Sequence, residues 1–154
     1  MPVRVQQEEF DIGAEIAGFC STDAGIGAIA SFIGLVRDRN EGDAVAGMEL
    51  EHYPGMTEKA LEGIVAEAKT RWDIIDALVI HRVGELKPLD QIVLVVVAGA
   101  HRSAAFAACE FIMDYLKTQA PFWKKEQTPQ GARWVEARAS DDQAAERWGG
   151  PQAK

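Results

Sequence analysis

The chain has 154 residues, of which 47% are hydrophobic and 26% charged, and its formal net charge is −8. This length and composition indicate one globular domain with a proper core, and no apolar run is long enough to span a membrane. The acidic balance argues against nucleic-acid binding, which requires an excess of Lys and Arg, and the N-terminus lacks the pattern of a secretion signal. We therefore expect a cytoplasmic protein that binds neither nucleic acid nor membranes, in which a local basic cluster would serve a specific anion.

Periodicity and turn signals divide the chain into helices and strands, with no internal repeat and no linker. In chain order, the expected elements are strands at 27–37 and 45–53, a helix from Thr57 to about Trp72, strands at 76–86 and 91–100, a helix from about 104 to 118, strands at 122–127 and 132–138, and a short helix at 140–148. The continuous apolar run QIVLVVVAGA (91–100) should be a central strand. Some strands are adjacent in sequence and others flank helices, so the expected class is α+β in a single domain, 1–154.

Capping residues and breakers set the expected element ends. Thr57 and Ser103 are expected to be the N-caps of the two long helices, and Pro121 cannot continue the second of them. Ser140 with Gln143 three residues later forms a capping box that would open the last helix. Residues 149–154 are expected to be a frayed tail.

The two cysteines, Cys20 and Cys109, lie far apart among small or apolar neighbours. They do not form a CxxC pair, and with only three histidines in the chain a zinc site is poorly supported. We expect both to be buried, reduced thiols, and we expect no metal site.

Two basic positions lie at strand ends. Arg37 ends the strand 27–37, where a solvated arginine is the plainer interpretation. In AGAHRSAAF (98–106), His101 and Arg102 lie between a buried strand and a helix start, whose free N–H groups suit an anion. Arg102 would add a forked donor for phosphate. The plainer alternative is that Ser103 only caps the helix and His101 bonds to nearby backbone.

The stretch IMDYLKTQAPFWKKE (112–126) gathers three lysines around one proline. A surface pair between Asp114 and Lys117 is the plain explanation of the first lysine. Lys124 and Lys125 follow the break in a short strand, where neighbouring side chains point to opposite faces, so only one can face a cleft with Lys117. Two lysines held in one pocket could supply a nucleophile or a proton-transfer group. The pattern alone leaves both interpretations open.

Several longer blocks resemble one known family. LEHYPGMTEKAL (50–61), HRVGEL (81–86), AHRSAAF (100–106), FIMDYLKTQAPFWKKE (111–126), RWVEAR (133–138) and AAERW (144–148) are together similar to the large, catalytic subunit of molybdopterin synthase. The resemblance covers roughly residues 27 to 148 in the same order, and residues 1–26 match only loosely. It implies an α/β-hammerhead fold with an additional small antiparallel sheet.

The resemblance also implies an activity and partners. Large subunits of this family form a central dimer, and a small ubiquitin-like sulfur-carrier subunit docks at each end. The Gly-Gly C-terminus of the small subunit carries a thiocarboxylate, from which two sulfur atoms pass to cyclic pyranopterin monophosphate to form the molybdopterin dithiolene. The expected enzyme is therefore a sulfurtransferase that needs no cofactor of its own, since the sulfur comes from the partner.

The family's site residues carry over onto the positions already singled out. The resemblance implies Lys117 as the catalytic lysine and Lys124 as the second lysine of the active site. The implied substrate-binding residues are Leu35, Val36, Arg37, His101, Arg102, Lys117, Lys124, Lys125, Glu126 and Arg138. Many members carry a basic residue where this chain has Leu35, so a backbone contact is the expected role there.

Two other classes of function compete with the enzyme. A binding module could hold an anionic pterin or nucleotide through the same cluster without making product. A pure assembly subunit would only dock a ubiquitin-like protein, and charge changes at Arg37 and Arg102 would leave activity untouched. Turnover that depends on the partner separates the enzyme from both.

Overall fold

A four-stranded sheet forms the centre of the computed structural model, which describes residues 2–40, 42–135 and 139–149. Its strands, in spatial order, are β1 (Val3–Gln6), β6 (Ile74–Arg82), β8 (Gln91–Gly99) and β2 (Ala28–Leu35). β1 is parallel to β6, and the other two pairings are antiparallel. The sheet is therefore mixed, and β8 is an interior strand, which confirms the prediction for the apolar run 91–100.

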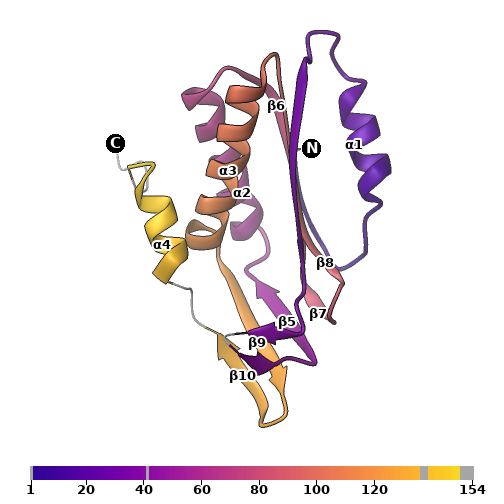
Figure 1. Ribbon diagram of the computed structural model, residues 1–154, viewed down its shortest axis with the longest axis vertical. Helices are drawn as coiled ribbons and strands as arrows, with labels where there is room; N and C mark the ends of the chain where they lie inside the picture. The colour runs from indigo at the N-terminus through magenta and orange to yellow at the C-terminus, as the bar shows by residue number, and fades with distance from the viewer. Residues whose placement is uncertain (1, 41, 136–138, 150–154) are drawn as a thin grey trace.

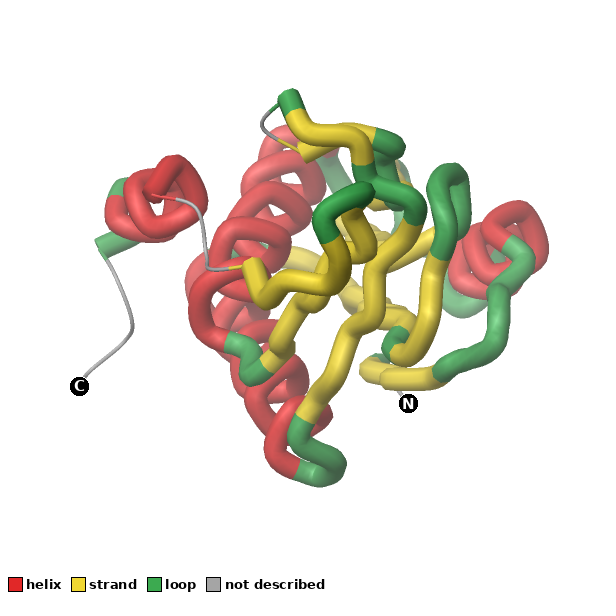
Figure 2. Tube along the Cα trace, turned by 90° about the horizontal axis from the view of Figure 1, so that it is seen from below, coloured by secondary structure: helices red, strands yellow, loops and turns green. Residues whose placement is uncertain are grey.

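Helices cover both faces of this sheet. α2 (Met56–Arg71) and α3 (Arg102–Gln119) lie on one face, and α1 (Ile12–Cys20) lies on the other (Figures 1 and 2). Along β8, Val93, Val95 and Val97 pack toward α2 and α3, whereas Leu94 and Val96 belong to the core cluster beneath α1. Both faces of β8 are buried, and this explains why its sequence is continuously apolar rather than alternating.

A second, antiparallel sheet lies at one end of the main sheet, next to the C-terminal end of α3 (Figure 1). Its strands, in order, are β10 (Gly131–Val135), β9 (Phe122–Thr128), β5 (Gly47–His52) and β7 (Gly84–Leu86). A short hairpin of β3 (Arg39–Asn40) and β4 (Asp43–Ala44) accompanies it. The expected α+β class, with an additional small antiparallel sheet, is confirmed.

The last helix, α4 (Ala139–Glu146), packs on the outer side of α3. The indole of Trp148 makes edge contacts with Trp72 and Phe111, and its Nε1 donates to Asp114 Oδ2 at 2.7 Å. Arg147 donates to the same carboxylate oxygen at 2.8 Å. Asp114 therefore anchors the C-terminal helix, rather than pairing with Lys117 as the sequence had suggested.

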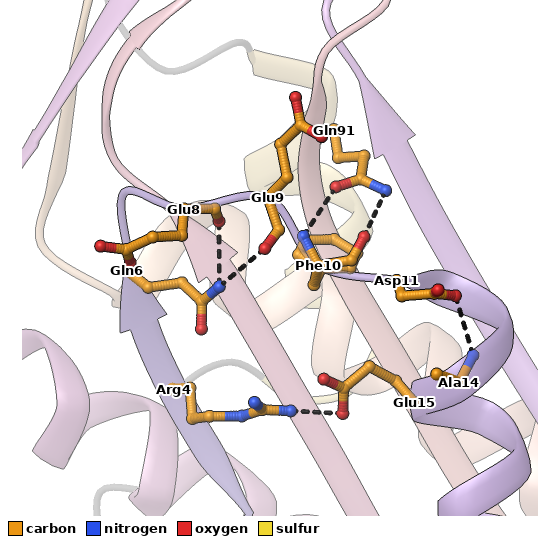
Figure 3. A network of polar contacts seen from close by, with 9 residues as sticks. All are labelled: Arg4, Gln6, Glu8, Glu9, Phe10, Asp11, Ala14, Glu15 and Gln91. Atoms are coloured by element: carbon orange, nitrogen blue, oxygen red, sulfur yellow. Dashed lines mark hydrogen bonds and ion pairs between the residues drawn. The ribbon is translucent and has the colours of Figure 1, made fainter.

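The N-terminal strand and helix were not predicted from the sequence. Figure 3 shows the polar contacts that hold them in place. Asp11 caps α1, because its Oδ1 accepts from the Ala14 N–H at 3.0 Å. The Gln91 side-chain amide accepts from the Phe10 N–H and donates to the Phe10 carbonyl, at 3.1 and 2.8 Å. An ion pair between Arg4 and Glu15 ties β1 to the helix. These polar contacts hold the connection between β1 and α1 against the end of β8.

The predicted helix caps were wrong. The N-cap of α2 is Gly55, whose N–H donates to Glu58 Oε1 at 2.8 Å, and Thr57 is buried inside the first turn. The N-cap of α3 is His101, and Ser103 lies within the helix. α4 begins at Ala139, which places Ser140 in the helix rather than at its cap. Each predicted cap lay one or two residues inside the true start, because cap residues also occur in first turns.

Two further expectations need correction. The single strand expected at 76–86 is two strands, β6 and β7, separated by Val83, and β7 begins at Gly84, whose φ of 90° favours glycine. Cys20 is exposed rather than buried, whereas Cys109 is buried and burial raises the pKa of its thiol to about 11. In the described part of the chain, no helix has both the length and the apolarity needed to cross a membrane.

Candidate active site

The break between α3 and β9 places two lysines at the same end of the molecule. Lys117 lies in the last turn of α3 and is exposed in the single chain, and Lys124 is the third residue of β9. Only residues 120 and 121 separate the helix from the strand. Pro121 has no N–H and cannot continue the helix, so the chain turns directly into the second sheet.

Strand alternation divides the residues of β9 between two faces. Phe122, Lys124 and Glu126 share the face that packs on the body of the molecule, where Phe122 joins the core and Glu126 is only 2% exposed. Lys125 points the other way, with its ammonium 4.7 Å from the ring centre of Trp134. The expectation that Lys124 and Lys125 point apart is confirmed, and Lys125 lies on the face away from Lys117.

His81 packs against the start of β9 between the two lysine positions in sequence, and the sequence analysis missed it. Its ring is 4% exposed and stacks on Phe122, with ring centres 3.9 Å apart and planes inclined by 19°. Burial lowers the pKa of His81 to about 4, opposed in part by its bond to the Arg82 carbonyl and reinforced by the positive charges of Lys117 and His52. The positive charge of Lys117 thus influences the imidazole of His81. The same imidazole stacks on Phe122, which lies two residues before Lys124.

No local signal could have identified His81. It lies in an apolar strand, where a histidine most often has a purely structural role. Its relevance comes from the pairing of β5 with β9, which sets His52 opposite Phe122, and from the stacking of Phe122 on β6.

Glu126 collects polar contacts from three segments. Its carboxylate accepts from Asn40 Nδ2 at 2.7 Å and from Arg133 Nη2 at 3.3 Å, and Lys124 Nζ lies 4.0 Å away. Asn40 is itself 8% exposed. The carboxylate of Glu126 therefore connects Lys124, Arg133 and the β3–β4 hairpin, and its expected contact with a substrate stays a prediction.

The segment before this hairpin carries the first group of expected substrate contacts. Val36 is 2% exposed, its N–H donates to the Asp90 carbonyl and its carbonyl accepts from Leu89, so its polar groups are already used. Leu35 is 45% exposed, and the strand pairing shifts register between Gly34 and Leu35. Arg37 is exposed, and its side chain is the cation of this segment that a ligand can reach.

His101 and Arg102 lie at the opposite end of the molecule from the lysines. They are exposed at the start of α3, whereas Lys117 is in its last turn, about 22 Å away at 1.5 Å per residue. The same separation is seen along the sheet, because Leu35 pairs with Gln91 and Ala28 with Gly99. One chain therefore does not bring His101 and Arg102 to the end of the molecule that carries Lys117, Lys124 and Arg37.

Arg138, the remaining expected site residue, lies outside the described residues. Within residues 2–40, 42–135 and 139–149, no group of three or more His, Cys, Asp or Glu side chains is arranged to hold a metal ion. The charged side chains that the described residues bring to this end of the molecule therefore include two lysines and an arginine, with the buried carboxylate of Glu126 beside Lys124.

The comparison with known proteins identifies the family of the chain. The sequence model of the MoaE protein family matches residues 5–119. The chain belongs to the MoaE protein family. The molybdopterin synthase catalytic subunit of Ralstonia nicotianae is 69% identical over 147 residues, which cover 96% of this chain and 84% of that protein. Family membership confirms the resemblance seen in the sequence and the expectation of an enzyme.

Solved structures agree with this MoaE fold. The molybdopterin biosynthesis MoaE protein of Burkholderia ambifaria is 59% identical, with a TM-score of 0.83 over 97% of this chain and 98% of that chain. A chain in the complex of subunits 1 and 2 of molybdopterin-converting factor from Helicobacter pylori shares the fold, with a TM-score of 0.74 at 20% identity over 90% of this chain and 92% of that chain.

Proposed function

We propose that this chain is the catalytic subunit of a molybdopterin synthase and transfers two sulfur atoms to cyclic pyranopterin monophosphate. The donor is the thiocarboxylated Gly-Gly C-terminus of a small ubiquitin-like subunit. The observation that supports the proposal is that Lys117 in the last turn of α3 and Lys124 in β9 flank a two-residue break in a MoaE-family chain. The name of the two-subunit Helicobacter pylori complex supports a protein partner of this kind.

The proposed reaction needs no redox partner and no cofactor. For each sulfur atom, the carbon–sulfur bond of the thiocarboxylate breaks and a carbon–sulfur bond forms on the substrate in place of one of its carbon–oxygen bonds. Water hydrolyses the partner's acyl group, so the oxygen that the acyl carbon gains balances the oxygen that the substrate carbon releases. The small subunit therefore leaves as an ordinary carboxylate, and no electrons are gained or lost. What the enzyme must supply is placement of the two reactants and stabilisation of negative charge as sulfur leaves.

The lysines suit these two tasks. Lys117, exposed at the end of a helix, is placed to polarise the acyl group of an incoming C-terminus or to transfer a proton to it. Lys124, whose side chain is 35% exposed beside Glu126, is placed to balance charge on the acyl oxygen or on the substrate. Arg37 reaches the same end of the molecule and provides a forked donor for the cyclic phosphate.

We infer that His101 and Arg102 act in the site of a second copy of the chain. They lie about 22 Å from Lys117 within one chain, by the rise of an α-helix, which is too far to hold a pterin that touches the lysines. A twofold dimer repeats each contact, so one copy can complete the site of the other at two equivalent places. In this arrangement the expected central dimer is required for catalysis, because each site contains residues of both copies.

Replacement of Lys117 by Ala tests the proposal. In a reaction reconstituted with thiocarboxylated small subunit and cyclic precursor, we expect dithiolene formation, followed by mass spectrometry, to fall by about 10²-fold or more, the range of proton-transfer catalysis. Lys117 is exposed, so the far-ultraviolet circular dichroism and the melting temperature should be unchanged. Lys59→Ala, at an exposed lysine of α2, is the matched control and should turn over normally. Near-normal product formation by Lys117→Ala would refute the assignment.

A further inference from the structure

Two buried polar side chains that the proposed reaction does not use contact the bend between Lys117 and Lys124. Thr57 of α2 is fully buried, and His81 of β6 is 4% exposed. Thr57 contacts Pro121, and His81 contacts Phe122. The bend is therefore held from two elements that lie far from it in the sequence.

Thr57 fixes the backbone at Pro121. Its Oγ1 accepts from the Tyr53 N–H at 3.0 Å and donates to the Pro121 carbonyl at 3.0 Å. A hydroxyl has one proton to donate, and the bond from Tyr53 leaves that proton directed at Pro121. Thr57 is itself held in the first turn of α2, where its N–H donates to the Tyr53 carbonyl at 2.9 Å. The bend is thus tied to the rigid start of a helix.

His81 fixes the next residue. Its Nδ1 lies 2.8 Å from the Arg82 carbonyl, which accepts only, so Nδ1 carries the proton and the ring is held by its own strand. The ring stacks on Phe122, and β6 is an interior strand of the main sheet. Because burial lowers the pKa of His81 to about 4, the ring is neutral near pH 7. It therefore holds Phe122 without adding a positive charge beside Lys117.

The two contacts act on the part of the backbone that joins the lysines. Lys117 lies four residues before Pro121, and Lys124 lies two residues after Phe122 on the same strand face. We propose that Thr57 and His81 are positioning residues that clamp the bend at residues 121–122 and thereby set the separation of Lys117 and Lys124. This inference rests on the proposed function, because it assigns a role in that reaction to residues that touch no reactant.

Thr57→Val tests the clamp, since valine keeps the shape of threonine but removes the hydroxyl. A shift of about 1 Å in a reacting group can cost up to about 10²-fold in rate. We expect kcat to fall by about 10-fold or more, with the precursor KM and the Kd for the small subunit unchanged. Thr57→Ser, which restores the hydroxyl, should recover most of kcat. Thr70→Val is the control, because the Thr70 hydroxyl also donates to a backbone carbonyl, that of Glu67, at the distant end of α2.

A second pair of variants decides the matter if Thr57→Val does not fold. His81→Phe keeps an aromatic ring against Phe122 and should retain kcat. His81→Ala removes the stack, and its kcat should fall by about 10-fold or more, because the rate is sensitive to small shifts of a reacting group. Normal kcat in Thr57→Val or in His81→Ala, or equal losses in His81→Phe and His81→Ala, would overturn the clamp. Lys117→Ala is measured in the same assay: if it is inactive while the clamp variants are normal, only this inference fails, and if it is active the proposed function fails as well.

Discussion

Around Lys124, single residues show how a buried carboxylate can organise a basic site. Glu126 is bound by Asn40 and Arg133 and lies 4.0 Å from Lys124. Shortening the Glu126 side chain would leave the buried Asn40 amide without its acceptor. An unsatisfied buried donor costs more free energy of folding than the hydrogen bond contributed. Glu126 therefore holds Asn40 and Arg133 in place beside Lys124, and the substrate contact that the family resemblance implies for it stays a prediction.

His81 leads to a prediction about stability and pH. Its pKa is about 4 in the folded chain and 6.5 as its ordinary value, so between these values the unfolded chain binds the proton more readily. The stability from neutral His81 is therefore complete above pH 6.5 and is lost as the pH falls toward 4, by up to about 3 kcal/mol. Urea unfolding of the wild type and of His81→Phe between pH 7 and 4 measures this loss in the free energy of unfolding.

The comparison of the two proteins isolates His81 from the carboxylates that titrate in the same range. We expect the free energy of unfolding of the wild type to fall more steeply with acid than that of His81→Phe. His101→Ala, at an exposed histidine, should leave the wild-type slope unchanged. Parallel curves for wild type and His81→Phe would show that the buried imidazole does not contribute.

At the scale of elements, the α3–β9 break is the feature that positions the two lysines of the proposed site. Gln119 ends the helix, Phe122 starts the strand, and the Phe122 N–H donates to the Ala120 carbonyl at 2.9 Å. The helix delivers Lys117 and the strand delivers Lys124, and the pairing of β9 with β5 holds the strand in place. Two different periodicities thus meet within one short stretch of sequence.

Pro121→Ala separates the ring of the proline from its carbonyl. The carbonyl that accepts from Thr57 remains in the variant, so we expect turnover to change little. The unfolded chain gains freedom when proline is removed, and we expect the free energy of unfolding to fall by about 0.4–1 kcal/mol, measurable by urea denaturation. A large loss of kcat in this variant would show that the ring of Pro121 itself is needed at the bend.

At the scale of the whole molecule, the two ends of α3 carry the two halves of the expected site. The helix runs back along the sheet from His101 and Arg102 at one end to Lys117 at the other (Figure 1). A single copy therefore carries the two groups of expected site residues at opposite ends of one helix. Two copies related by a twofold axis are the simplest assembly that can join them.

Coexpression of Lys117→Ala with Arg102→Ala tests this arrangement. Each variant alone should be inactive, but a mixed dimer would contain one site with both defects and one intact site. Random mixing of the two chains should therefore restore about one quarter of wild-type activity, by the symmetry of the dimer. Lys117→Ala with Lys124→Ala is the control, since both lysines belong to one chain and no activity should return. Absence of recovery in the first mixture would place all the residues of a site in one chain.

The sequence by itself determined the family, the α+β class, the central position of 91–100 and the opposite directions of Lys124 and Lys125. These features follow from local periodicity and from long blocks of characteristic residues, and both can be recognised within short segments of the sequence. The short strand Val3–Gln6, the cap at Asp11 and the division between β6 and β7 at Val83 gave too weak a local pattern to be predicted.

Only the tertiary structure decided which groups meet. Contacts such as that of His81 with Phe122 and that of Thr57 with Pro121 join residues that are far apart in the sequence, and no local pattern announces them. Strand pairing and helix direction likewise carried His101 and Arg102 away from Lys117, although all three are basic positions at element ends. Short stretches of the sequence show which residue types the proposed site contains. The geometry of the site depends on long-range packing and, we propose, on a second copy of the chain.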